Sequence, residues 1–145
     1  MSLTNLLYHA VFSTKDRRPS ISPDIQERLY EYIGGIVRGE GGIQLAIGGV
    51  ADHLHILMKL PATRAVAEVM CKLKANSSGW LGRQQPDHPG WQDEYAAFTV
   101  SQSRVKSVRE YIAGQADHHR RQSFRDELIA LLRRHEVEFD ERYIA

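Results

Sequence analysis

The stretch IQLAIGGVADHLHILMKL, residues 43–60, consists of two apolar runs joined by a short connection. Residues 43–50 and residues 53–60 each have the length and the apolar composition of a strand. The connection over residues 50–52 is short enough for the second run to fold back directly on the first. The stretch therefore predicts a β-hairpin near the middle of the chain.

The second strand of this hairpin carries two histidines one residue apart. Side chains alternate between the two faces of a strand, so His53 and His55 project to the same side, about 7 Å apart along the strand. Leu54 and Ile56 project to the other side. The two imidazoles can serve one metal ion if a third ligand comes from elsewhere. The alternative is a pair of polar residues on an accessible face of the sheet.

Further strand and helix patterns surround the hairpin. Strand patterns cover residues 6–14 and 94–101. Helical patterns, with apolar residues at spacings of three and four, cover residues 22–42 and about 63–81. The resulting order, β-α-β-β-α-β, is typical of the ferredoxin-like split βαβ fold. In that fold the first and third strands occupy the middle of an antiparallel sheet, so the histidines would lie on a central strand.

Two more helices are expected after the fourth strand. The first begins at a serine cap, Ser101 or Ser103, and runs to about His119, and the second covers residues 123–135. We therefore expect a single domain over residues 1–145 of the α/β (α+β) class. Its core would be a ferredoxin-like βαββαβ antiparallel sheet, followed by two C-terminal helices.

Tyr111 and Gln115 lie four residues apart in the first of these helices, and this spacing places them on one helix face. A tyrosine that borders the core is most often structural. A glutamine one turn away, however, offers a carbonyl oxygen as a hard ligand for a metal. A phenol is a poor nucleophile at neutral pH unless a neighbour withdraws or accepts its proton, and a metal beside it can lower that cost.

Composition and charge describe an ordinary globular protein. The chain has 145 residues, 42% hydrophobic and 26% charged, and a net charge of +1. This balance argues against a protein that coats DNA indiscriminately but leaves room for a local basic patch. A single cysteine, Cys71, excludes an internal disulfide. The first residues lack the features of a secretory signal, and no apolar run is long enough for a bilayer, so we expect a cytoplasmic protein without membrane contact.

In combination, His-x-His on a central strand and Tyr-x-x-x-Gln on a downstream helix resemble the single-tyrosine HUH transposases of the smallest bacterial insertion sequences, the IS200-like or TnpA-type enzymes. The resemblance extends along nearly the whole chain. The segments that carry it, in the order of that family, are YHAVFSTKDRRP, DHLHIL, KLKANSSGWL, WQDEYAAFTVSQS, YIAGQADHH and EFDERYI.

The resemblance implies a function and a set of site residues. A divalent metal, Mg²⁺ or Mn²⁺, would be held by His53, His55 and Gln115 and would bind the scissile phosphate of single-stranded DNA. Tyr111 would be the catalytic nucleophile, forming a 5′-phosphotyrosine and releasing a 3′-OH. The protein would then be a DNA transposase of insertion-sequence ends that recognises DNA hairpins as a homodimer. Whether Tyr111 acts in its own subunit or across the dimer stays open.

Other residues are candidates for supporting roles. Asp52 immediately precedes His53 and either orients an imidazole from behind or belongs to the hairpin turn. Trp80 and Trp91 are either base-stacking residues or part of the core. The basic residues expected to contact DNA phosphates are Lys15, Arg17, Arg18, Lys72 and Lys74.

Three other functions are compatible with parts of the sequence. A domesticated relative would use the same chemistry on repeated chromosomal palindromes, and the sequence does not decide between the two. A non-catalytic ferredoxin-like nucleic-acid-binding module is disfavoured because residues 53–60 contain no aromatic side chain for stacking on bases. An iron oxygenase with two histidines and one carboxylate is disfavoured because no acidic partner for the histidines is obvious.

Overall fold

The computed structural model describes residues 2–144, and its sheet has the strand order expected for a ferredoxin-like fold. The four strands are β1 (Leu6–Ser13), β2 (Ile43–Val50), β3 (His53–Leu60) and β4 (Ala96–Val100). They pair antiparallel in the order β2-β3-β1-β4. The first and third strands therefore lie in the middle, and the predicted α+β fold is confirmed.

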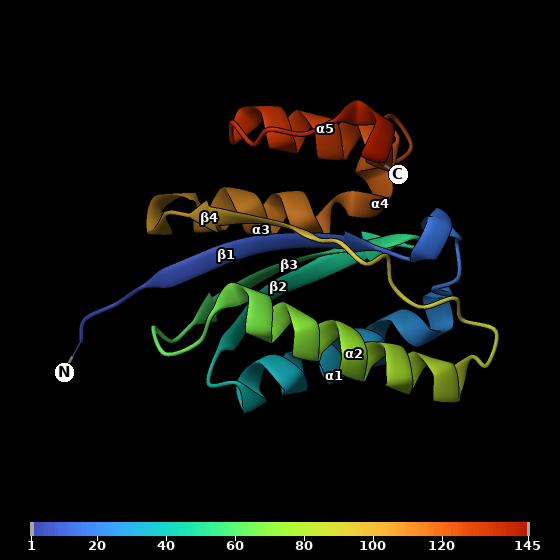
Figure 1. Ribbon diagram of the computed structural model, residues 1–145, viewed down its shortest axis with the longest axis horizontal. Coiled ribbons are helices and arrows are strands. Elements are labelled where there is room, and N and C mark those ends of the chain that lie inside the picture. Colours follow the sequence, from blue (N-terminus) through green and yellow to red (C-terminus); the bar gives the residue numbers. More distant parts are fainter. Residues whose placement is uncertain (1, 145) are drawn as a thin grey trace.

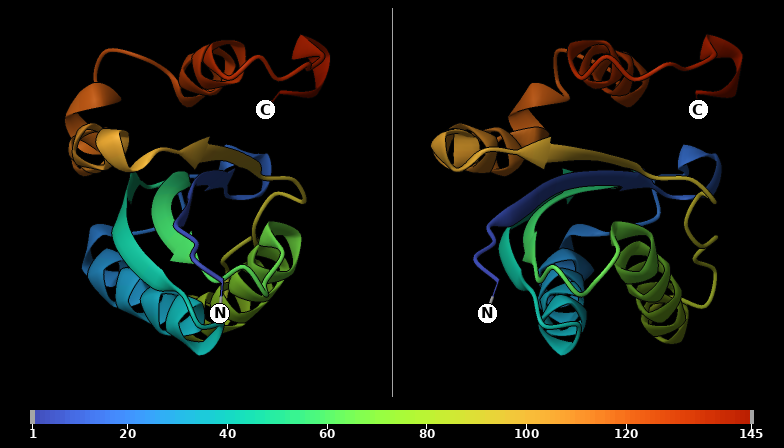
Figure 2. Two further views of the ribbon diagram at one scale, coloured as in Figure 1. Left: turned by 90° about the vertical axis from the view of Figure 1, so that its left-hand side faces the viewer. Right: turned by 60° about the vertical axis from the view of Figure 1, so that its left-hand side comes forward.

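The helices lie on both faces of this sheet (Figures 1 and 2). On one face are α1 (Pro23–Gly39) and α2 (Val66–Gln84). On the other face are α3 (Val105–Ala113), α4 (Gln115–His118) and α5 (Phe124–Arg134), with α5 farthest from the sheet in Figure 1. None of the helices in the described part of the chain is long and apolar enough to cross a membrane.

The main hydrophobic core fills the space between the sheet and the first pair of helices. Leu54 and Ile56 of β3 pack there with Leu29 and Ile33 of α1 and Leu73 of α2, and all five are fully buried. Each such side chain contributes about 1.5–3 kcal/mol through burial. Because alternate residues of β3 point to opposite faces, this core fixes His53 and His55 on the face of α3, α4 and α5.

Two neighbouring strands hold the backbone of the histidines. In the sheet register Val11 of β1 and Gly48 of β2 flank His55 on its two sides. The hairpin turn between β2 and β3 lies immediately before His53, as expected. The histidine positions are thus fixed by two hydrogen-bonded strands, which leaves little freedom for movement along the chain.

Two of the expected helices begin or end differently. The helix expected to continue to about His119 is interrupted at Gly114, which leaves helical geometry with φ −90° and ψ 14° and separates α3 from α4. Glycine is a poor helix former, which accounts for the position of the break. The second helix begins at Val66 rather than Thr63, because residues 61–64 form a turn in which the Arg64 N–H donates to the Pro61 carbonyl.

The last helix matches its expected span to within a residue at each end. The Ser123 side chain accepts a hydrogen bond from the Asp126 backbone N–H and so caps the N-terminus of α5. Asp126 and Glu127 occupy the first turn, where the helix dipole favours negative charge. The cap therefore fixes where α5 begins, and with it the position from which the Glu127 side chain projects.

Helix α3 approaches β2 closely at one glycine. A Cβ atom built on Gly48 would lie 2.5 Å from the Ile112 carbonyl oxygen. Real side chains do not approach backbone this closely, so the contact requires glycine. Ile112 is the neighbour of Tyr111, and the position of the tyrosine thus depends on the missing side chain.

We expect Gly48→Ala to lower the free energy of unfolding by about 1–3 kcal/mol, since the added methyl group must push α3 away from β2. Gly79→Ala is the matched control. Gly79 lies within α2, where a built Cβ meets the Arg83 guanidinium at an ordinary 3.7 Å, and alanine there should stabilise by about 0.5–1 kcal/mol. Urea unfolding of both variants tests the pair, and an unchanged midpoint for Gly48→Ala would contradict the close approach.

Candidate active site

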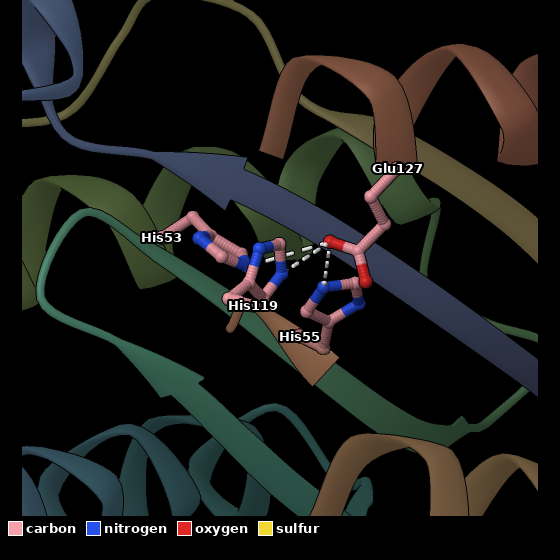
Figure 3. A group of neighbouring side chains, drawn as sticks. All are labelled: His53, His55, His119 and Glu127. Carbon is pink, nitrogen blue, oxygen red and sulfur yellow. Dashed lines mark hydrogen bonds and ion pairs between the residues drawn. The ribbon is translucent and has the colours of Figure 1, made fainter. Parts of the chain in front are cut away.

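Three histidine rings point their Nε2 atoms at one carboxylate oxygen (Figure 3). His53 and His55 come from β3, and His119 follows α4. Their Nε2 atoms lie 3.4, 3.0 and 3.0 Å from Oε1 of Glu127 on α5. Both β3 histidines and Glu127 are almost completely buried, so this cluster is shielded from bulk water.

In each of these rings the other nitrogen, Nδ1, contacts a second polar group. The three partners of the Nδ1 atoms are the Asp52 carboxylate at 2.8 Å, the His9 ring at 2.8 Å and the Gln122 carbonyl oxygen at 2.9 Å. Such outer partners fix the tautomer and orientation of metal-binding histidines in proteins. The three rings are therefore oriented with Nε2 toward the centre of the cluster.

The second oxygen of Glu127 faces the tyrosine helix. Glu127 Oε2 accepts hydrogen bonds from the Tyr111 hydroxyl and, at 3.0 Å, from the Gln115 side-chain N–H. The carbonyl oxygen of the same Gln115 amide lies 3.0 Å from His53 Nε2 and 2.9 Å from His119 Nε2. The break at Gly114 thus does not separate Tyr111 from Gln115, since both reach the same carboxylate.

The donor set fits a divalent metal. The ligand atoms of His53, His55, His119 and Glu127 all lie within 4.8 Å of one another, and the Gln115 carbonyl oxygen lies among them. Imidazole and oxygen ligands together suit Mn²⁺ and related ions, while Mg²⁺ prefers oxygen. Metal binding would have to displace any proton held by an Nε2 atom.

Opposing effects set the charges in the cluster. Burial disfavours the charged form of His53, but hydrogen bonds to Asp52, Glu127 and Gln115 outweigh it and raise the pKa of His53 to about 9. Burial would likewise raise the pKa of Glu127, but hydrogen bonds from the histidines hold that pKa well below its usual range. Glu127 is therefore an anion whose charge is balanced by the groups around it.

Tyr111 is held in its neutral form. Burial and the hydrogen bond to the anionic Glu127 raise the pKa of the Tyr111 hydroxyl above its ordinary value. In the metal-free cluster the phenol is thus a weak nucleophile. Its ionisation requires additional positive charge near its oxygen, which a cation at the cluster would supply.

The structure brings five of the expected site residues together within one chain: His53, His55, Asp52, Tyr111 and Gln115. The sequence-based interpretation missed His119 and Glu127 as members of this cluster. For Glu127 a signal was present, because it lies three residues after Phe124 and four before Leu131, on the buried face of α5. A carboxylate on the apolar face of a helix indicates a buried polar partner. The expectation that the histidines lack an acidic neighbour was therefore wrong.

The basic residues divide into two groups. Lys15 and Arg17 lie in a short 3-10 turn after β1, Arg18 follows it directly, and Lys15 and Arg18 are exposed. This turn lies against the hairpin turn next to His53, since the Thr14 N–H donates to the Asp52 carbonyl at 2.9 Å. Of the two groups, it is thus the one nearer to the cluster.

Lys72 and Lys74 lie on α2, on the opposite face of the sheet from the histidines. Lys72 pairs with Glu40 at 3.0 Å. The Lys74 ammonium group donates to three backbone carbonyls of the loop before β4, those of Gln92, Asp93 and Glu94, at 2.5, 2.8 and 3.3 Å. Lys74 therefore has a structural task in addition to any contact with DNA.

The two tryptophans have different surroundings. Trp91 is 8% exposed, and its indole N–H donates to Ser77 Oγ at 2.9 Å. Of the two interpretations of Trp91, the structure favours the core. Trp80 is partly buried against the core, and its ring stacks on Tyr32 with centroids 5.4 Å apart.

The chain belongs to the family of IS200-like transposases, whose pattern matches residues 2–115. The ISDra2 transposase TnpA of Deinococcus radiodurans is 22% identical over 119 residues, which are 77% of this chain and 85% of that protein. The transposase for insertion sequence element IS200 of Salmonella typhimurium is 27% identical over 120 residues, 78% of each chain. The resemblance seen in the sequence is thus confirmed, and the protein is a transposase.

Solved structures show the same fold at low identity. A crystal structure of a Deinococcus radiodurans R1 protein superposes with a TM-score of 0.65 and 21% identity, over 79% of this chain and 93% of that one. A REP-associated tyrosine transposase bound to a REP hairpin superposes with a TM-score of 0.64 and 14% identity, over 82% and 71% of the two chains. His119 and Glu127 lie beyond the residues that the family pattern matches.

The two lysines of α2 offer a matched pair of variants. Lys74→Ala should lower the free energy of unfolding by about 1–3 kcal/mol, because three carbonyl oxygens lose a charged donor. Lys72→Ala should cost less than about 1 kcal/mol, since it removes an exposed ion pair. Thermal unfolding of both variants checks this. Equal melting temperatures would mean that Lys74 does not hold the loop before β4.

Proposed function

We propose that this transposase cleaves and rejoins single-stranded DNA through a covalent bond to Tyr111, with a divalent metal at the histidine cluster. The observation that carries the proposal is the convergence of the Tyr111 hydroxyl, the Gln115 amide and the two β3 histidines on the Glu127 carboxylate. A tyrosine used only for packing has no need of a metal-binding cluster at its hydroxyl. The family match supports the same chemistry.

In this proposal each group has a distinct task. His53, His55 and Gln115 hold the metal, Mg²⁺ or Mn²⁺, and Asp52 orients His53 through the 2.8 Å contact with Nδ1. The bound cation would neutralise charge on the phosphoryl oxygens. Attack by the Tyr111 oxygen on phosphorus, with loss of the phenol proton, forms a tyrosine–phosphate ester and breaks the bond to the 3′-oxygen, which takes up a proton. The ester conserves the energy of the broken bond, so the strand can be rejoined without ATP.

The proposed substrate is single-stranded DNA next to a hairpin. The basic turn of Lys15, Arg17 and Arg18 lies beside the cluster and would contact phosphates, with Lys72 and Lys74 as more distant candidates. One structural neighbour was solved with a REP hairpin, which supports hairpin recognition here. We also propose a homodimer in the cytoplasm, following the expectation from the sequence.

A second function uses the same site. The structural neighbour bound to a REP hairpin is a REP-associated transposase, and its likeness to this chain supports a domesticated role in processing chromosomal palindromes. Inverted or hairpin-forming ends that flank the gene would favour the mobile element. Scattered palindromes without a bounded element would favour the domesticated enzyme.

The first test of the proposed function is a covalent adduct. Purified protein is mixed with labelled single-stranded oligonucleotides from the DNA that flanks its gene, with Mn²⁺ or Mg²⁺. We expect an adduct that survives SDS, and its complete loss with Tyr111→Phe or with EDTA, because the phenolic oxygen and the cation are both required. An adduct that persists in Tyr111→Phe would refute Tyr111 as the nucleophile.

Mixing two inactive variants tests whether the site is complete in one subunit. Tyr111, Glu127 and His55 contact one another within one chain, so we expect that Tyr111→Phe mixed with His55→Ala forms no adduct. Were the tyrosine to act across a dimer, the mixed dimer would contain one intact site. Recovery of adduct on mixing and refolding the two variants together would therefore show action in trans.

A further inference from the structure

Glu127 is the one buried acidic side chain at the candidate site that the proposed chemistry has not used. It is 1% exposed, and it comes from α5, outside the residues that the family pattern matches. Burial of a carboxylate is costly unless its oxygens have partners. Its two oxygens have different partners, and this difference indicates what the residue does.

Oxygen Oε1 has more nitrogen neighbours than it can satisfy. A carboxylate oxygen offers about two lone pairs, yet the Nε2 atoms of His53, His55 and His119 all lie within 3.4 Å of it. At any moment at least one of these contacts is without a hydrogen bond. A cation among the four atoms would be bound by all of them at once.

His119 gives the same indication independently. Its Nδ1 faces the Gln122 carbonyl oxygen at 2.9 Å, and a carbonyl can only accept, so the ring proton lies on Nδ1. In the neutral ring Nε2 then carries a lone pair. That lone pair faces two oxygens, Oε1 of Gln115 at 2.9 Å and Oε1 of Glu127 at 3.0 Å. The contacts become favourable when a positive charge lies between them.

The other carboxylate oxygen of Glu127, Oε2, faces the Tyr111 hydroxyl. It accepts the hydrogen bonds of the Tyr111 hydroxyl and of the Gln115 amide N–H. The Gln115 N–H at this oxygen also fixes its amide so that the carbonyl oxygen points at the histidines. One carboxylate thus contacts the metal-binding atoms with one oxygen and the attacking group with the other.

We infer that Glu127 is a metal ligand that also positions Tyr111, and that His119 completes the ligand set with it. Oε1 binds the cation together with the Nε2 atoms of the three histidines, while Oε2 holds the Tyr111 hydroxyl. This inference rests on the proposed function, since it adds a carboxylate and an imidazole to that metal site. Three imidazoles and a carboxylate favour Mn²⁺ over Mg²⁺, because Mg²⁺ prefers oxygen ligands.

The alternative is that Glu127 joins α5 to the sheet and binds no metal. Both roles make Glu127 important for stability, so a melting temperature does not separate them. Metal affinity does separate them. A neutral ring can be removed without a change of charge, so a fall in affinity in His119→Ala reports the loss of a ligand. Glu127→Gln removes a negative charge next to the cation as well, so wild-type affinity in this variant would show that the carboxylate takes no part in binding.

The test measures Mn²⁺ binding, from the electron paramagnetic resonance signal of free Mn²⁺, in wild type, Glu127→Gln, His119→Ala and Gln115→Ala. The exposed Glu138→Gln and His135→Ala serve as controls for charge and for imidazole. We expect Glu127→Gln and His119→Ala to bind Mn²⁺ at least about tenfold more weakly. Even the replacement of a residue that only hydrogen-bonds to a metal ligand typically lowers metal affinity by about tenfold or more. The controls should retain the affinity of wild type.

The outcomes separate the two proposals. Wild-type affinity in both Glu127→Gln and His119→Ala, with weaker binding in Gln115→Ala, would overturn the inference and leave the proposed function standing. No Mn²⁺ binding by wild type would overturn the metal site as a whole. If thermal unfolding in EDTA shows that Glu127→Gln does not fold, His119→Ala decides, because this replacement leaves the Glu127 contacts to Tyr111 and Gln115 in place.

Discussion

The contact of the Glu127 carboxylate with both β3 and α3 is the interaction on which the arrangement of the site depends. The sheet fixes the two histidines of β3, and the close approach of α3 to β2 at Gly48 places the backbone of Tyr111, but neither orients the tyrosine hydroxyl. Apolar packing holds α5 over the sheet through side chains such as Phe124 and Leu131, and such packing has no direction of its own. Hydrogen bonds to a buried anion are short and directional. They set the position of the tyrosine relative to the histidine rings.

One face of the sheet carries the polar cluster, and the other carries the apolar core that stabilises the fold. A buried cluster of three imidazoles, an amide and a carboxylate brings costs in desolvation that its own hydrogen bonds only partly offset. The opposite face carries the apolar core between β1, β3 and the pair α1 and α2. Alternation along β3 joins the two, because Leu54 and Ile56 anchor the strand that presents His53 and His55. Stability on one face thereby supports polar burial on the other.

The parts that the sequence predicted are those encoded by short-range patterns. Alternation and helical spacing predicted the strand order, and the pairs His53–His55 and Tyr111–Gln115 could be read within a few residues. His119 and Glu127 could not be placed this way, because their positions depend on the break at Gly114 and on the cap at Ser123, which together fold α5 back over the sheet. Lys74 was expected to face DNA, whereas its partners are carbonyls 18 to 20 residues further along the chain.

The electrostatics of the cluster connect the Tyr111 hydroxyl to the histidines of β3. Burial and the Glu127 anion raise the pKa of Tyr111, so the phenol keeps its proton in the metal-free cluster. Any positive charge that joins the opposite oxygen of the same carboxylate weakens its hold on that proton. A tyrosine placed in water would lack this dependence. In the proposed function, this arrangement would link attack on DNA by Tyr111 to a fully assembled site.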